Sequence, residues 1–392
     1  MSTAEKFVPL QTRSERPTSY DPAFFGQPTG REVNWKHTDL KRIAALLVDE
    51  ETENVGRDGV AYDLTGLEEY LVESSGQEAA VRGEVFQPED LPGAIAWKRC
   101  ENALHIRVPE GQSVEEPLIA RLHGQDADLH ANAHVIIEAM PGSEATVVLH
   151  HTGSVAYSQN VEIIVRENAR LNVVTVQDWQ DDTVHASNHQ ARVDDGAFLK
   201  HIVVSFGGGV VRVNPSVRLH GTGSETEMYG VSFADAGQHM ESQVYMFHEG
   251  ENTVGNVLYK DALQGKGARS VWIGDVLIGS DAVGTDSYEK NQNLVLTDGT
   301  RTDSIPNLEI KNGNIEGAGP ASATSRFDDE HMFYLQSRGI SAEQARRLVV
   351  VGFLMEIVQK IGIASIEERI GELIEEELKA GAELAPASKA GA

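Results

Sequence analysis

The chain has very little cysteine. Cys100 is the one thiol among 392 residues, which excludes a disulfide within the chain and a metal centre built from four of its own thiolates. Aromatic residues are also scarce, at 6%, whereas glycine is frequent, with 37 residues. That balance favours β-structure with many tight turns over a core of large aromatic side chains.

Positive charge is in short supply as well. The chain carries 33 lysines and arginines against 60 aspartates and glutamates, which gives a net charge of −27. Nucleic-acid phosphates and anionic membrane surfaces repel such a chain, so we expect neither as a partner. The best apolar run, Leu348–Phe353, is far too short to span a bilayer, and the polar stretch Met1–Tyr20 lacks the apolar core of a signal peptide. We therefore expect a cytoplasmic protein.

The motifs of common catalytic and nucleotide-binding sites are absent from the sequence. It contains no G-x-x-x-x-G-K-[ST], no G-x-G-x-x-G, no H-E-x-x-H and no G-x-S-x-G. The run Gly207–Gly209 is not followed by a lysine at the spacing of a phosphate loop, so we interpret it as a tight turn. We expect a chain that is not an enzyme and that binds no cofactor by itself.

Histidines are numerous, at 14, but their spacing does not indicate a metal site. On a strand, His185 and His189 would share a face and lie more than about 10 Å apart at about 3.3 Å per residue. That separation is too large for both to bind one ion at about 2.1 Å each. His150 and His151 would point to opposite faces of a strand. We therefore expect these histidines to be structural.

Short alternating runs separated by Gly, Asn and Asp extend from about residue 94 to residue 315 and predict β-strands. They are Ala133–Ala139, Ala145–His150, Val161–Val165, Leu171–Val176, Phe198–Ser205, Val217–His220 and Glu227–Phe233. Four turns separate these runs, and a small residue follows each of them, at Ala145, Ala169, Ala197 and Ser224. The turns are Pro141–Gly142, Glu167–Asn168, Asp195–Gly196 and Gly221–Gly223. The interval of roughly 24 to 28 residues is typical of solenoids. Each unit needs stacked neighbours to bury its apolar face. This pattern favours a β-helix over a β-sandwich, which periodicity alone leaves open.

Helical signals are confined to the two ends of the chain. Apolar residues recur at helical spacing from about Asn34, and capping patterns near the C-terminus predict three helices, the second opened by Ser341 with Gln344. We expect four parts. They are an N-terminal arm and small α-rich domain over 1–90, a β-helix core over 91–320, a C-terminal helical domain that binds partners over 321–380, and a disordered tail over 381–392.

The stretch Pro306–Ile340, PNLEIKNGNIEGAGPASATSRFDDEHMFYLQSRGI, carries the most specific pattern in the chain. A P-x-L-E-I strand leads through a turn and a small-residue step at Ala323-Thr324 to a helix reading D-E-x-x-F-Y-L-x-S-R-G-I. This pattern resembles the C-terminal signature of the SufB/SufD family of iron–sulfur cluster assembly proteins. Trp35–Thr38 and Lys260–Leu263 resemble further stretches of that family, so the likeness touches both ends and the middle of the chain.

The resemblance implies a mainly β fold, in which a right-handed parallel β-helix lies between a small N-terminal α-rich domain and a C-terminal helical domain. It also implies a non-catalytic scaffold subunit of a SufBCD-type complex for iron–sulfur cluster assembly. The β-helix edge would pair with a SufB-like subunit, and the C-terminal helices would dock a SufC-like ATPase. Asp298–Thr302 has no thiol where SufB carries a cluster-building cysteine, and Pro320–Ser322 replaces its E-H-E triplet, so the chain resembles the SufD branch.

One departure from the SufD pattern concerns a metal ligand. The histidine that SufD proteins usually carry before the small-residue step falls here on Pro320 or Ala321, and neither side chain can bind iron. Glu309 is then our candidate ligand for a transient iron–sulfur cluster at a shared interface, with Glu316 or His331 as substitutes. The alternative for Glu309 is a strand residue held in a salt bridge.

Four residues are candidates for partner binding, because their types are enriched at protein interfaces. They are Phe333, Tyr334, Arg338 and Phe353. Core packing remains the alternative for the first two aromatics.

Two further hypotheses stay open for the whole chain, namely a β-helix enzyme acting on carbohydrate and a homodimeric SufD-like paralogue without a cluster role. A homodimer is also compatible with the isolated scaffold.

Overall fold

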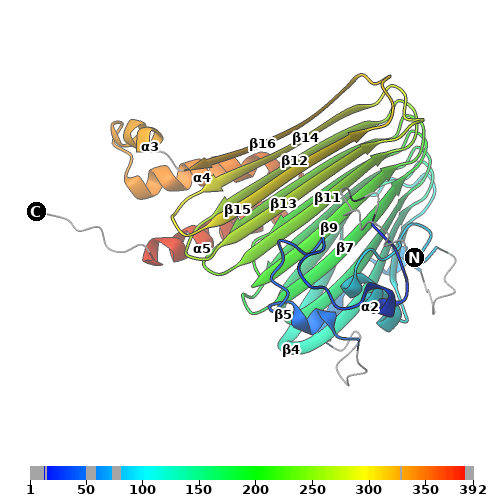
Figure 1. The fold of residues 1–392 in the computed structure, drawn as a ribbon, viewed down its shortest axis with the longest axis horizontal. Coiled ribbons are helices and arrows are strands. Elements are labelled where there is room, and N and C mark those ends of the chain that lie inside the picture. Colours follow the sequence, from blue (N-terminus) through cyan, green and yellow to red (C-terminus); the bar gives the residue numbers. More distant parts are fainter. Residues whose placement is uncertain (1–12, 14–15, 50–58, 73–80, 327–328, 385–392) are drawn as a thin grey trace, which may run out of the picture.

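The computed structural model describes residues 13, 16–49, 59–72, 81–326 and 329–384, and its centre is a parallel β-solenoid (Figure 1). Its strands are β3 (Leu104–Val108), β4 (Leu118–Ala139), β5 (Glu144–Val165), β6 (Arg170–Trp179), β7 (Val184–Val193), β8 (Phe198–Ser205), β9 (Val210–Leu219), β10 (Glu225–Ala234), β11 (His239–His248), β12 (Val254–Leu263), β13 (Arg269–Ile278), β14 (Asp286–Val295), β15 (Arg301–Ile310) and β16 (Gly317–Arg326). Two short strands, β1 (Val60–Asp63) and β2 (Leu71–Val72), pair antiparallel with β4 and β3.

Successive strands alternate between two parallel sheets. β6, β8, β10, β12, β14 and β16 stack in an even-numbered sheet, β7, β9, β11, β13 and β15 stack in an odd-numbered sheet, and β5 joins the two. Val147 lies beside Val173 and Val257 lies beside Glu289, so one coil takes 26 residues early in the solenoid and 32 late. The predicted parallel β-helix is confirmed, with coils that lengthen along the chain.

Each coil turns at a residue in the left-handed backbone region. Gly142, Asn168, Gly196 and Gly223, which lie in the four predicted turns, have φ values of 66°, 55°, 60° and 67°. The N–H of each donates to a carbonyl in the turn of the next coil, at 2.8 to 3.0 Å. Glycine and asparagine adopt this conformation readily, so the Gly, Asn and Asp punctuation of the sequence fixes where each coil bends.

The solenoid interior is filled by side chains that stack in register from coil to coil. Val147, Val173, Met228 and Val257 form one such stack, in which His201 lies between Val173 and Met228. All of these side chains are buried. Fully burying one such apolar side chain is worth about 1.5–3 kcal/mol, and it requires a neighbouring coil on each side.

The N-terminal segment covers the outer face of the odd-numbered sheet and contains little helix. Its elements are α1 (Pro22–Phe25), the 3₁₀ turns η2 (Ala44–Leu47) and η4 (Glu68–Tyr70), and α2 (Leu91–Arg99). Turns replace the helix that we expected from Asn34, because Trp35, Ile43 and Leu47 pack individually against α2 and Val210 of the sheet. The described residues of 1–90 are therefore not α-rich.

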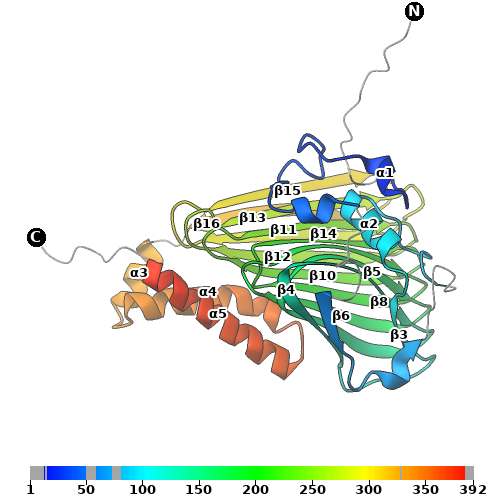
Figure 2. The same cartoon turned by 90° about the horizontal axis from the view of Figure 1, so that it is seen from below.

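Three helices follow the solenoid: α3 (Asp329–Gln336), α4 (Ala342–Val358) and α5 (Ala364–Leu384). Ser341 and Gln344 form the predicted capping box of α4. Leu354 and Ile370 are fully buried against the outer face of the even-numbered sheet. Figure 2 shows these helices and the N-terminal segment on different sides of the solenoid.

The element limits differ from the expected ones at two places. β16 continues the solenoid to Arg326, past the limit that we placed at 320, and α5 includes residues 381–384, which we expected in a disordered tail. The rest of that tail, 385–392, lies outside the described residues. Within the described ranges, no helix has the length and apolar character needed to cross a bilayer.

Candidate interaction surfaces at the end of the solenoid

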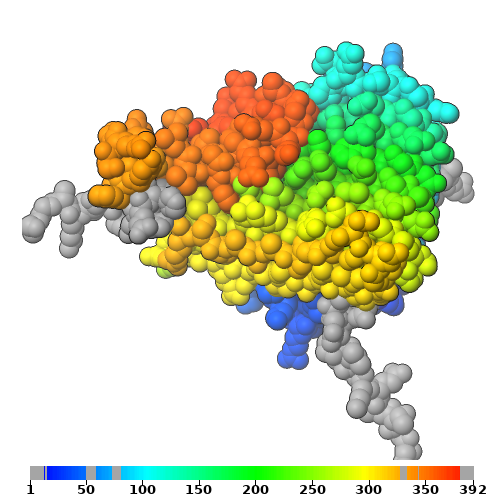
Figure 3. All heavy atoms as spheres, turned by 90° about the horizontal axis from the view of Figure 1, so that it is seen from above, coloured from blue at the N-terminus to red at the C-terminus, as the bar shows by residue number. Residues whose placement is uncertain are grey.

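The last coil leaves an open edge on both sheets. β15 and β16 end the strand order, so in the part of the chain that the structure describes each has a strand neighbour in its sheet on one side only. Figure 3 looks onto this end, where the yellow and orange residues form a row across the molecule. Backbone N–H and C=O groups on a free strand side are a template for another strand.

Both edge strands carry a proline on the free side. The N–H groups of Arg301 and Lys311 donate to carbonyls on the β13 side, each at 2.9 Å. Backbone nitrogens alternate sides along a strand, and those of the odd-numbered residues 301 and 311 point toward β13. The backbone nitrogen of Pro306, at an even-numbered position, therefore points away from β13. Gly317 donates to the β14 side at 3.3 Å, which by the same alternation places Pro320 on the free side of β16. Neither proline therefore removes a hydrogen bond inside the solenoid.

The candidate ligand Glu309 lies on β15, close to this edge. Its carboxylate is 3.4 Å from the Lys311 ammonium, and its side chain is 37% exposed. This is the salt-bridged strand residue that we considered as the alternative. Of the two substitutes, Glu316 is exposed before β16, and the side chain of His331 lies outside the described part of the chain. No group of three or more His, Cys, Asp or Glu side chains among the described residues is arranged to hold a metal ion.

The positions of the missing SufD-type histidine lie on β16. Pro320 is beside Glu289 and Ala321 is beside Lys290 of β14, and both β16 residues are exposed. The structure thus brings these positions to the free edge but gives them no side-chain donor or acceptor. Glu309 lies on the neighbouring strand of the other sheet, so the candidate oxygen ligand and the vacant histidine positions share one end of the molecule.

Beneath the edge, the solenoid interior becomes polar. Asn293 Nδ2 donates to Asn291 Oδ1 at 2.8 Å and to Thr324 Oγ1 of β16 at 3.2 Å. Asn291 Nδ2 donates to Asp261 Oδ2 at 3.2 Å, and Ser304 of β15 joins the same network. These bonds tie the last strands of both sheets together and hold the edge in shape.

Glu289 is a buried carboxyl that sequence reasoning missed. It is 3% exposed, and neither carboxyl oxygen has a hydrogen-bond partner among the described residues. Burial, followed by the charge of Asp275, raises its pKa to about 8. The run Asp286–Asn293 is polar at nearly every position, so alternation could not show that Glu289, Asn291 and Asn293 face inward.

The C-terminal helices present a second surface. Phe333 and Tyr334 on α3 are 74% and 55% exposed, so neither packs into a core. Arg338 lies over the Tyr334 ring, at 4.5 Å from its centroid. Phe353 differs, because it is half-buried with the Lys260 ammonium 4.6 Å from its ring centroid. Phe353 therefore helps to hold α4 on the solenoid, and the exposed surface consists of the other three.

The histidines singled out by the sequence are buried in the solenoid. His185 accepts a hydrogen bond from Trp179 Nε1 at 3.1 Å, and His189 bonds to His201 at 2.9 Å. His151 is fully buried, whereas its neighbour His150 is half-buried near Asp178, as the opposite faces of a strand predict. Burial lowers the pKa of His151 and of His201 to about 4, so both are neutral near pH 7.

Comparison with known proteins places this solenoid in a family. A family model described as "SUF system FeS cluster assembly, SufBD core domain" matches residues 122–353, more than half of the chain. The chain belongs to the SufBD family. The match begins in β4 and ends in α4, so it includes both edge strands. Cys100 lies before the matched region, at the end of α2, where its Sγ donates to the Asn102 carbonyl at 3.2 Å.

Related SufBD proteins align with nearly the whole chain. An "Iron-sulfur cluster assembly SufBD family protein" of Mycobacterium leprae is 43% identical over 366 residues, which are 92% of this chain and 93% of that protein. One from Mycobacterium tuberculosis is 42% identical over 367 residues, 92% of each. A second SufBD protein of Mycobacterium leprae is 30% identical over 261 residues, 65% of this chain and 30% of that protein. That bacterium thus has two SufBD relatives of this chain.

Proposed function

We propose that this SufBD chain is a SufD-like, non-catalytic scaffold subunit of a cytosolic SufBCD-type complex for iron–sulfur cluster assembly. The observation that carries the proposal is the pair of free edge strands, β15 and β16, at the end of a solenoid whose matched region contains no cysteine. Such a subunit can shape and join an assembly, but the thiolates for cluster building must come from another chain.

The assignment to the SufD branch rests on which side-chain groups are missing from the edge strands and the loop before β15. No thiol lies between Asp298 and Thr302, and Pro320–Ser322 offers no carboxylate or imidazole. Cys100 is buried at the other end of the solenoid. A SufB-like subunit would need such groups for its own chemistry, so their absence favours the partner role.

Pairing with a SufB-like subunit would use both edges together. A related solenoid has strands of the same parallel spacing, so its own edge can continue the two sheets of this chain with main-chain hydrogen bonds. The exposed Ile310 and Tyr288, 45% and 52% exposed near the last strands, would become covered in that arrangement. Two strand additions in one interface fix orientation better than one.

Docking of a SufC-like ATPase would use the C-terminal helices. Phe333, Tyr334 and Arg338 form an exposed surface of residue types that often dominate binding energy. α4 and α5 are anchored to the even-numbered sheet, so movement of a bound ATPase could be transmitted to the solenoid. The chain has no phosphate loop of its own, and the nucleotide chemistry would belong to that partner.

An iron–sulfur cluster, as the cargo of assembly, would form at the shared interface. This chain would supply an oxygen ligand at most, and Glu309 is the candidate because its half-exposed carboxylate lies on an edge strand. Breaking its ion pair with Lys311 would cost little, since exposed pairs are worth about 0–1 kcal/mol.

The test is co-expression of this chain, carrying an affinity tag, with SufB-like and SufC-like proteins of the same organism. The wild-type chain should retain both partners. Ser322→Pro removes a backbone donor that faces the free side of β16, so it should reduce retention of the SufB-like subunit at least tenfold. Ser322→Ala keeps that donor and is the matched control.

The helix surface is tested in the same purification. Phe333→Ser combined with Tyr334→Ser should release the ATPase at least tenfold more readily and leave the SufB-like subunit bound. Phe24→Ser, which alters an aromatic residue of α1 that is 57% exposed, is the control. A wild-type chain that retains neither partner at any salt concentration contradicts the proposal. A wild-type chain recovered only as a homodimer would favour a paralogue without a cluster role.

A further inference from the structure

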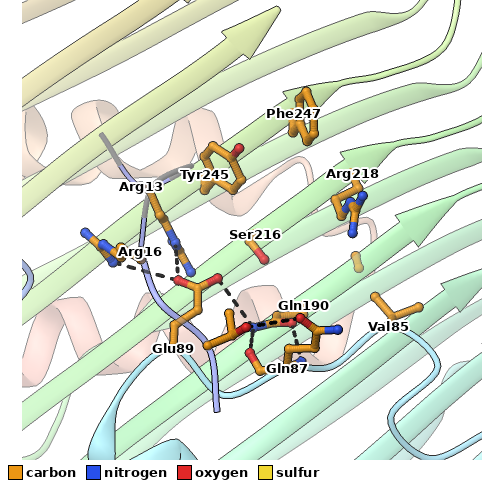
Figure 4. Close-up of a pocket in the computed structure, with 12 residues that line it drawn as sticks. Arg13, Arg16, Val85, Gln87, Glu89, Gln190, Ser216, Arg218, Tyr245 and Phe247 are labelled. Carbon is orange, nitrogen blue, oxygen red and sulfur yellow. Dashed lines mark hydrogen bonds and ion pairs between the residues drawn. The ribbon is translucent and has the colours of Figure 1, made fainter. Parts of the chain in front are cut away.

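A pocket with a volume of about 240 Å³ lies on the outer face of the odd-numbered sheet, away from the free edges and the C-terminal helices (Figure 4). Its floor is formed by residues of β7, β9 and β11, among them Ser216 and Tyr245. Arg13 and Arg16 from the N-terminal segment and Glu89 from the loop before α2 form its wall. Three separate parts of the chain therefore meet around this space.

Most polar groups at the pocket are already used to hold its walls. Arg13 Nε donates to Glu89 Oε2 at 2.9 Å, and its Nη1 donates to backbone carbonyls of the sheet. Gln190 of β7 fixes Gln87, donating to its carbonyl at 2.7 Å and accepting from its N–H at 2.8 Å. The pocket is thus a built site rather than a gap between loosely packed loops.

Arg16 is the exception. Its side chain is 7% exposed, and its one ion-pair contact among the described residues is Nη1 to Glu89 Oε2 at 3.9 Å, beyond hydrogen-bond distance. Burial, followed by the charge of Arg13, lowers the pKa of Arg16 to about 10. A guanidinium has five N–H donors, and no described residue accepts a hydrogen bond from that of Arg16, so these donors are available to a ligand in the pocket.

The other charges near the pocket have partners elsewhere. Arg218 of β9 is paired with Glu249, with its Nε 2.9 Å from the carboxylate. Asp275 of β13 is the further carboxylate that acts on Arg16, but it accepts a hydrogen bond from Asn307 at 2.9 Å and is not in an ion pair with Arg16. Burial raises the pKa of Asp275, and the charges of Arg16 and Arg13 oppose that rise. Tyr245 of β11 also lines the pocket.

We propose that this pocket binds a small oxyanion, with a carboxylate or phosphate group on the Arg16 guanidinium. The planar fork of arginine matches both groups, and Arg13 supplies a second positive charge at the same wall. The volume lies below the range of about 300–1,000 Å³ of drug-sized ligand sites, so the ligand is smaller than a nucleotide. Binding would also tie the N-terminal segment to the sheet, because the pocket has walls from both.

Isothermal titration of the full chain tests the proposal, with inorganic phosphate and malonate as separate probes at constant ionic strength. We expect saturable one-site binding of at least one probe, and the comparison tells a phosphate site from a carboxylate site. Arg16→Gln should weaken binding at least tenfold, and Arg16→Lys should weaken it less because the charge remains. Arg121→Gln, at an exposed arginine of β4 that pairs with Asp63 at 3.8 Å, should leave binding unchanged.

A second variant distinguishes a loss of the binding site from a folding defect caused by Arg16→Gln. Ser216→Leu fills the pocket floor and leaves all arginines in place, so it should also weaken binding at least tenfold. Circular dichroism of both variants without ligand checks that the solenoid remains folded. The proposal is overturned if the wild-type chain binds neither probe with saturation. It is equally overturned if Arg16→Gln or Ser216→Leu, while folded, binds as the wild type does.

Discussion

Arg212 shows how a single residue attaches the N-terminal segment to the solenoid. Its guanidinium is fully buried, at 2.8 Å from Asp90 and 3.1 Å from Glu241, and it lies 4.2 Å from the centroid of the Trp35 ring. Burial would raise the pKa of Glu241, but His239 and Arg212 hold it well below its ordinary value. Three charged groups are therefore buried together and depend on one another.

Replacing Arg212 by methionine should destabilise the protein by about 3–5 kcal/mol, because Asp90 and Glu241 would remain buried without their cation. Urea unfolding followed by circular dichroism measures the free energy. Arg218→Met, on the same strand but at a side chain that is 54% exposed, should cost less than about 1 kcal/mol. Equal losses in the two variants would show that the buried ion pairs do not hold the segment.

At the scale of elements, the turns were predictable and the N-terminal segment was not. Left-handed turns need Gly or Asn, and a strand between two turns needs alternating apolar and polar side chains. Both requirements are therefore visible as local patterns in the sequence. Trp35 and Ile43 have helical spacing, but their contacts with α2 and Val210 are tertiary and leave no such mark. Tertiary packing therefore overrides local pattern in this segment.

The candidate site was predictable to a similar degree. The signature at Pro306–Ile340 led to both edge strands and to α3, and Phe333, Tyr334 and Arg338 do lie exposed. Sequence could not show that Phe353 turns toward the solenoid, nor that Arg16 and Tyr245 line one pocket, because residues far apart in the chain create those surroundings.

The docking of α4 can be tested at one position. Leu354 is fully buried against the even-numbered sheet, so Leu354→Ala should weaken the attachment of α4 and α5 by about 2–5 kcal/mol. Hydrogen exchange over residues 342–384 should then speed up while exchange in β6–β13 stays slow. Leu348→Ala, at a position of the same helix that is 56% exposed, is the control. Uniformly faster exchange throughout the solenoid would contradict separate docking.

The whole molecule should respond to pH in two opposite ways. His151 and His201 titrate near pH 4 in the folded chain and near 6.5 when unfolded, so the unfolded state binds more protons between these values. The free energy of unfolding should therefore fall as the pH falls from 6.5 to 4. Glu289 acts in the other direction, because it titrates near 8 when folded and 4.5 when unfolded. The contribution of Glu289 to the free energy of unfolding is therefore lost as the pH rises from 4.5 to 8.

Urea unfolding at pH 4.5, 6.5 and 8.5 measures the loss of stability toward low pH and the loss toward high pH. His201→Gln should reduce the loss between pH 6.5 and 4.5 by on the order of 2 kcal/mol, and Glu289→Gln should be more stable than the wild type at pH 8.5 by a few kcal/mol. His123→Gln, at an exposed position of β4, should leave the profile unchanged. Parallel profiles for all four proteins would mean that the buried groups do not set the pH response.

The two prolines of the last coil have a consequence for the isolated chain. An unguarded pair of strand edges invites stacking of identical chains into filaments, and Pro306 and Pro320 each leave a gap in the row of donors that such stacking needs. Any chain that adds strands here must tolerate both gaps at once, in one alignment. Copies of the isolated chain should therefore resist polymerising through this end of the solenoid.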